Sequence, residues 1–261
     1  VKRGESFTYQ GSPTIDEIEQ ISKISESNKR EYGIQLNSLP NGSTQTVILR
    51  GNERSISAPG GKHNSRTVFF HTHWSGNEQD RSPNSVISMT PSFLPGRYYQ
   101  FLVDDFGNNM MGLHGGGLLN IISPRGITVM IEQEKHSHEA AITAKIRNKM
   151  GVANTTSSAI LIIRSGKYNG EIIDDFTPES ETANHLDEKD YLVFTVRVPE
   201  LEEDTSFLFV TFKKLKSLNI GLEEMCFQNG VNKLVEHLDI DISHRNNIYS
   251  ALSTHSDKAK I

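Results

Sequence analysis

The hydrophobic pattern at the start of the chain predicts one helix followed by a strand pair. Isoleucines at positions 15, 18, 21 and 24 recur at helical spacing, which predicts a helix over residues 15–28. Thr14 and Glu17 match a capping box at its start. Strand-like segments over residues 30–36 and 46–50 flank the turn residues Leu39-Pro40-Asn41-Gly42, so we expect an antiparallel hairpin after the helix.

The next apolar run ends in two histidines. Residues 67–70 suit a buried strand and continue directly into His71-Thr72-His73. Side chains alternate along a strand with period two, so His71 and His73 should point to the same side. Two such imidazoles repel each other as cations but suit one shared divalent metal. The chain has ten histidines, so two of them can have this spacing by chance. The surrounding residues must therefore show whether the pair is a metal site.

The remaining pattern divides the chain into a lead-in and two parts. Residues 1–12 are polar and rich in Gly and Ser, which predicts a flexible lead-in. Further strand and helix patterns, among them strands over 118–122 and 127–131, complete an α/β unit over residues 13–150. Residues 151–261 form a C-terminal portion, either a second small α+β module or an extension onto the same sheet. Its expected strands cover 159–163, 191–198 and 206–212, and its expected helix covers 222–238.

Composition narrows the class of protein. The chain has 261 residues, 35% of them hydrophobic, which is enough for a sizeable core. Its net charge of -5 argues against a nucleic-acid partner held through phosphates. Without an apolar run near the ~18 residues of a membrane span, we expect no membrane insertion. The single cysteine, Cys226, excludes an internal disulfide and is compatible with the cytoplasm. Because the chain begins with Val1, we expect it to be part of something longer.

The order of Glu31, His71-Thr72-His73 and Ser82 resembles the JAB/MPN (JAMM) metalloprotease family. That family has a glutamate on an early strand after the first helix, an HxH at a strand end, and an SxxD that opens a helix after a short loop. Here Glu31 follows the first predicted helix, and eight residues separate His73 from Ser82. The resemblance covers residues 13–125. It implies a cytidine-deaminase-like α/β sandwich, a mixed sheet flanked by helices, with the C-terminal α+β portion as an extension.

The resemblance also implies a zinc site and a reaction. His71 and His73 would bind zinc, which lowers the pKa of a bound water toward ~7. Glu31 would act as general base and then as general acid, and Ser82 would donate a hydrogen bond to the oxyanion. The substrate would be a protein or peptide, cleaved at an amide bond or at an isopeptide bond to a ubiquitin-like tail.

The chain departs from the family at the third metal ligand. Ser85 occupies the position of the family's aspartate, and a neutral hydroxyl is a poor zinc ligand. Asp80 or Glu78, in the loop before Ser82, would be the substitute carboxylates. Two functions therefore stay open: a zinc-dependent peptidase or isopeptidase impaired by the missing aspartate, and a catalytically silent JAB/MPN-like scaffold that binds a partner protein.

A third reading rests on Glu132 and Glu134. They follow the strand-like residues 127–131 and look like the ExE of arginine-class ADP-ribosyltransferases, with Arg50 as the first-strand arginine. That family also has a Ser-Thr-Ser strand, where this chain has His71-Thr72-His73. We therefore favour a charged strand end for the two glutamates.

Overall fold

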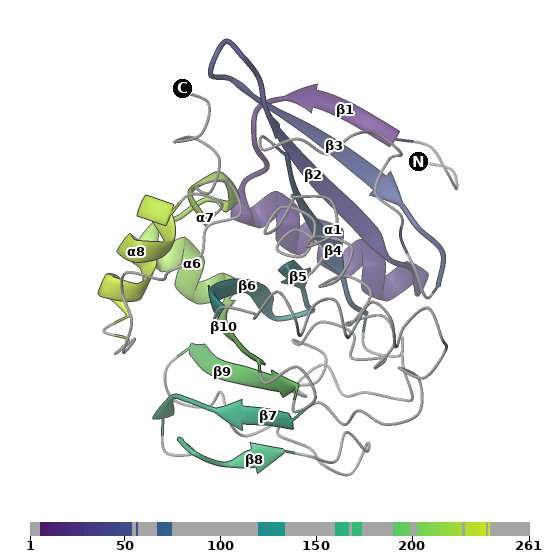
Figure 1. Ribbon diagram of the computed structural model, residues 1–261. Coiled ribbons are helices and arrows are strands. Elements are labelled where there is room, and N and C mark those ends of the chain that lie inside the picture. The colour runs from purple at the N-terminus through teal and green to yellow at the C-terminus, as the bar shows by residue number, and fades with distance from the viewer. Residues whose placement is uncertain are drawn as a thin grey trace, which may run out of the picture.

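The protein folds around one mixed β-sheet with a few short helices (Figure 1). The computed structural model describes residues 6–53, 56, 67–74, 120–133, 160–166, 169–173, 190–198, 203–225, 228–238 and 240. Within these residues the strands lie in the order β1-β3-β2-β4-β5-β6-β10-β9-β7-β8. The fold is thus a mixed α/β or α+β fold. No helix in the described ranges has the length and apolarity to cross a membrane.

The predicted first helix is confirmed as α1 (Ile15–Asn28). Thr14 Oγ1 accepts from the Glu17 backbone N–H at 3.2 Å, and the Glu17 carboxylate accepts from the Thr14 N–H at 2.7 Å. The buried stripe differs from the isoleucine row, since it consists of Ile15, Ile18, Ser22 and Ser25. Ile24 stays 46% exposed. The helix therefore turns two serine hydroxyls toward the sheet.

The predicted hairpin is confirmed as β2 (Tyr32–Ser38) and β3 (Thr44–Arg50). Its turn is closed by the Gly42 N–H, which donates to the Leu39 carbonyl at 2.9 Å. Gly42 has φ +81°, a conformation that costs glycine little. On its other side, β2 pairs antiparallel with β4 (Thr67–Thr72), the strand that leads into the histidines.

The flexible lead-in expected over residues 1–12 was partly wrong. Ser6–Gln10 forms strand β1, which pairs antiparallel with β3. Phe7 and Tyr9 alternate with polar neighbours, a pattern typical of strands. Strand β1 is only five residues long and forms by pairing with β3. That pairing is a long-range contact, which composition does not reveal.

The remaining strands, including those of the C-terminal portion, continue the same sheet. β5 (Asn120–Ile122) runs parallel to β4, and β6 (Gly126–Gln133) follows it. β10 (Glu203–Thr211) then pairs antiparallel with β6. On its other side β10 pairs with β9 (Tyr191–Val198), and β7 (Ile160–Ile163) and β8 (Ile172–Ile173) complete the order.

The range predicted as one helix, residues 222–238, contains two helices. A further helix, α6 (Phe212–Leu218), was not predicted. α7 (Leu222–Met225) and α8 (Gln228–His237) share the predicted range. α6 begins where the sequence indicated the end of a strand. Thr211 caps it, accepting from the Lys214 N–H at 3.2 Å. The spacing of Phe212, Leu215 and Leu218 was the available signal for α6.

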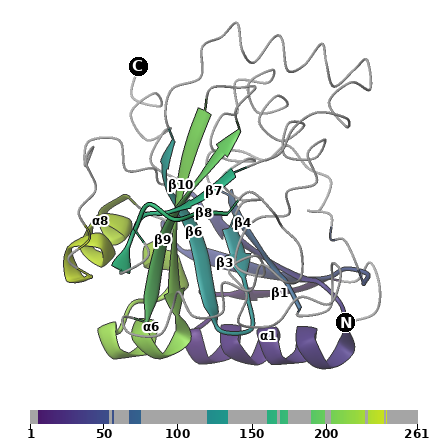
Figure 2. The ribbon, with the colours of Figure 1, turned by 90° about the horizontal axis from the view of Figure 1, so that it is seen from below.

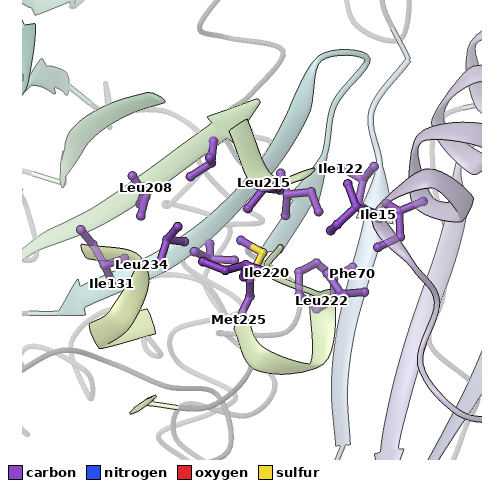
Figure 3. Close-up of a cluster of buried hydrophobic side chains, with 14 of the residues drawn as sticks. Ile15, Phe70, Ile122, Ile131, Leu208, Leu215, Ile220, Leu222, Met225 and Leu234 are labelled. Atoms are coloured by element: carbon purple, nitrogen blue, oxygen red, sulfur yellow. The ribbon is translucent and has the colours of Figure 1, made fainter. Parts of the chain in front are cut away.

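All described helices pack on one face of the sheet (Figure 2). Residues of α1, α6, α7 and α8 share one hydrophobic core with alternate residues of the strands, among them Phe70, Ile122, Ile131 and Leu208 (Figure 3). The intervening residues of β4, Phe69 and His71, therefore face the opposite side. The histidines lie at the end of β4 on the face away from the helices.

Candidate metal centre

The two histidine side chains converge at the end of β4. Their Nε2 atoms are 3.1 Å apart, and their rings meet edge to face with centroids 4.9 Å apart. Zinc binds imidazole nitrogen at about 2.0–2.1 Å. A zinc ion at that distance from both nitrogens would subtend an N–Zn–N angle of about 98°, close to tetrahedral. The pair therefore fits two of the four ligands of one zinc ion.

The protonation of His71 also suits a metal ligand. Burial lowers the pKa of His71 from 6.5 to about 4, because the charged imidazolium loses its hydration. The residue as a whole is half-buried, whereas its Nδ1 atom is buried and has no hydrogen-bond partner among the described residues. His71 is thus neutral near pH 7, the form in which imidazole binds a metal.

Glu31 lies at the same end of the sheet as the histidines. The β2–β4 register pairs Gly33 with His71, and the Tyr32 N–H donates to Thr72 Oγ1 at 2.8 Å. One step further, the register brings Glu31 opposite His73. Period two then puts Glu31 on the face of Gly33 and His71. The residue is 5% exposed, and its backbone continues the β3 ladder through Gly51 and Asn52, at 2.8 and 2.9 Å.

A hydrogen-bond network behind the histidines links the two halves of the site. Thr72 is fully buried, and its Oγ1 lies 2.7 Å from Ser25 Oγ on α1. Ser25 Oγ also donates to the Arg30 carbonyl at 2.5 Å. Each hydroxyl has one proton, so Thr72 must donate to Ser25 while it accepts from the Tyr32 N–H. Thr72, the residue between the histidines, is thus linked directly to Tyr32 and, through Ser25, to Arg30, the two residues on either side of Glu31.

A close packing contact shapes the face around His71. The Phe69 ring lies 6.5 Å from the His71 ring, with an interplanar angle of 19°. A Cβ atom at Gly33 would lie only 2.6 Å from Phe69 and 2.8 Å from Ile56. Gly33, the register partner of His71, is therefore glycine because the Phe69 ring occupies the space of a side chain.

The other predicted site residues are only partly placed. Ser82, Ser85, Asp80, Glu78 and Glu134 lie outside the described residues. Trp74 donates its indole N–H to the Glu53 carbonyl at 2.9 Å, so it packs on the loop after β3. The described part of the chain contains no group of three His, Cys, Asp or Glu side chains that could hold a metal ion. No third ligand therefore accompanies His71 and His73 among these residues.

The residues of the ADP-ribosyltransferase reading lie on separate strands. Arg50 ends β3 and Glu132 belongs to β6, with β2, β4 and β5 between them in the sheet. At about 4.8 Å per strand, β3 and β6 are some 19 Å apart across the sheet, so the structure does not bring Arg50 and Glu132 together.

Sequence reasoning did not find the positioning residues Thr72 and Ser25. The available signal was the polar spacing of Ser22 and Ser25 on the inner side of an otherwise apolar helix stripe. A buried serine needs a hydrogen-bond partner, but its identity depends on which strand lies beneath the helix.

Comparisons with protein-family models, with curated protein sequences and with solved structures found no match to this chain.

Proposed function

We propose that this protein is a zinc-dependent peptidase or isopeptidase of JAMM type, with a cytidine-deaminase-like arrangement of its first part. The observation that supports this most is the 3.1 Å approach of His71 Nε2 to His73 Nε2. It occurs at the end of β4, beside the start of the strand that follows Glu31. Two imidazoles that converge at one strand end, with a buried glutamate at the same end of the neighbouring strand, are the residue types that metal-assisted hydrolysis of an amide needs.

In this proposal His71 and His73 hold the metal, and Glu31 moves the proton. Bound zinc supplies an acidified water and polarises the carbonyl of the substrate. Glu31 accepts a proton from the attacking water as its oxygen bonds to the carbonyl carbon. Glu31 then delivers that proton to the amine nitrogen as the C–N bond breaks. By resemblance, Ser82 donates a hydrogen bond to the oxyanion, and a lysine isopeptide to a ubiquitin-like tail is the expected substrate.

The third protein ligand would come from the segment after His73. Asp80 and Glu78 are the substitute carboxylates that the sequence offers, with Asp80 the one we test, and Ser85 occupies the position of the family's aspartate. A zinc ion held by two histidines and water alone would bind weakly, because structural and catalytic sites use three or four protein ligands. Asp80→Asn should therefore weaken zinc binding more than Ser85→Ala does.

Metal content tests the proposal directly. The purified chain, equilibrated with zinc and dialysed, should retain about one zinc per chain by elemental analysis, as expected for one mononuclear site. His71→Ala and His73→Ala should lose it. His237→Ala is the matched control, because His237 lies exposed at the end of α8. Equal zinc loss in the control would mean adventitious binding.

Glu31→Gln separates binding from chemistry. Glutamine keeps the shape of the side chain but cannot take a proton, so zinc should remain while cleavage falls by at least about 100-fold. Lysine-linked diubiquitin and a fluorogenic ubiquitin C-terminal amide are the probes. A Glu31→Gln variant with unchanged cleavage would remove Glu31 from its assigned role.

The scaffold alternative keeps one observation in its favour. The described residues contain no third metal ligand beside the histidines. If the chain takes up no zinc at neutral pH with the ion supplied, the protein-binding scaffold becomes the better interpretation.

A further inference from the structure

We propose that two copies of this chain associate by pairing their β1 strands, antiparallel, about a twofold axis at Thr8. In the described sheet β1 has a neighbour on one side only, β3, and the other side of the strand is an open edge (Figure 1). Ser6–Gln10 contains neither a charged residue nor a proline. Such residues are the usual protection of an edge against pairing. Phe7 is also 56% exposed.

The hydrogen-bond pattern identifies which backbone groups of β1 face outward. The Gly11 N–H donates to the Thr44 carbonyl at 2.7 Å, in the register that pairs Ser6 with Leu49. Bonded pairs alternate along an antiparallel ladder. Residues 7, 9 and 11 therefore bond to β3, while Ser6, Thr8 and Gln10 direct their N–H and C=O groups away from it.

A twofold axis at Thr8 uses every one of these outward groups. It places Thr8 opposite Thr8 of the second copy and Ser6 opposite Gln10 of the second copy. All three pairs are then of the hydrogen-bonded type, which gives six interchain bonds. An axis at Phe7 or Tyr9 would satisfy only four within the strand. The pattern of the β1 edge thus favours a single register.

The same register matches the side chains. Phe7 comes opposite Tyr9 of the second copy, in the non-bonded pairs where side chains approach most closely. Aromatic pairs across strands are favourable, and so is the Thr8–Thr8 pair on the other face. Phe7 and Tyr9 lie on the face of α1, since their β3 partners are Ile48, which packs against the core, and Thr46. The exposed Phe7 ring would be covered.

The opposite edge offers less to a second copy. β8 has two residues, Ile172–Ile173, and Ile172 is 60% exposed. A strand of that length provides at most one hydrogen-bonded pair within it. This edge is therefore the natural control position.

Sedimentation velocity of the full chain over a concentration series tests the proposal. The wild-type chain should shift from monomer to dimer as concentration rises. Thr8→Lys and Thr8→Glu should each stay monomeric, because like charges would face each other at the axis. Their equimolar mixture should dimerise again. Ile172→Lys should dimerise as the wild type does.

Three outcomes would overturn the pairing: a wild-type chain that stays monomeric, a Thr8→Lys chain that still dimerises, or an Ile172→Lys chain that does not. Hydrogen exchange covers the case in which the Thr8 variants fail to fold. The outward Thr8 amide of the wild-type chain should exchange more slowly as concentration rises, whereas the Tyr9 amide, bonded within the sheet, should not change. An exchange rate of the Thr8 amide that does not change with protein concentration would contradict the proposal.

Discussion

Replacing Thr72 by valine tests whether one hydroxyl holds the candidate metal centre together. Valine has nearly the shape of threonine, so the change leaves little cavity and removes mainly the hydrogen bonds. The variant loses the bond from the Tyr32 N–H, 2.8 Å, and the bond to Ser25 Oγ, 2.7 Å. Both lie behind the histidines in a buried part of the sheet.

The expected loss follows from those two bonds. The Tyr32 N–H would stay buried without its acceptor, which costs about 1–3 kcal/mol. The bond to Ser25 contributes about 1 kcal/mol, and Ser25 keeps its second partner, the Arg30 carbonyl. Together we expect Thr72→Val to lower the free energy of unfolding by about 2–4 kcal/mol. Zinc affinity should fall by about 10-fold, the lower end of the effect of removing a hydrogen bond from a metal ligand itself, because the two bonds of Thr72 anchor the strand between the histidines.

Urea denaturation and zinc titration by calorimetry measure the two effects. Thr195→Val is the matched control, because Thr195 is equally a buried strand threonine. Thr195 lies on β9, away from the histidines at the end of β4. Its Oγ1 is hydrogen-bonded to Ser206 Oγ at 2.9 Å and accepts from Arg164 Nε at 3.1 Å. The control should lose stability but keep zinc affinity. A Thr72→Val chain within about 0.5 kcal/mol of wild type, or equal zinc loss in the control, would show that the Thr72 hydroxyl does not hold the site.

Two further predictions concern His71 and its neighbours. The pKa of His71 falls from 6.5 to about 4 on folding. As pH falls, His71 is therefore protonated in the unfolded chain before it is protonated in the folded protein. The metal-free protein should thus keep its full stability above pH 6.5 and lose up to about 3 kcal/mol as pH falls to about 4. Urea denaturation against pH should show that slope, and His71→Asn should remove it. Gly33→Ala should lower the free energy of unfolding by about 1–3 kcal/mol, because Phe69 and Ile56 must move. Gly221→Ala, with nothing within 4 Å, should change it by less than about 0.5 kcal/mol in the same assay.

Local signals predicted the parts of the fold whose structure depends on neighbours in sequence. The capping box and the isoleucine spacing placed α1 at Ile15–Asn28, since a helix and its caps involve residues within one or two turns. The turn at Gly42 placed the β2–β3 hairpin for the same reason. Predictions were wrong where a distant partner decides. Residues 6–10 are a strand only because β3 lies beside them.

The candidate site divides in the same way. Period two along a strand already indicated that His71 and His73 share a side, because that depends on three consecutive residues. The position of Glu31 beside them depends on β2 pairing with β4, which joins segments some forty residues apart and follows from burial of a shared hydrophobic face.

The helix, the hairpin and the pair of imidazoles could thus be predicted from neighbouring residues, because each depends on local geometry. Packing of the whole sheet placed the helices on one face and left the histidines on the other. It also decided that the Thr72 hydroxyl bridges α1 and β2. The reason is physical: strand order and register minimise exposed apolar surface over the whole sheet, and no local segment contains that information.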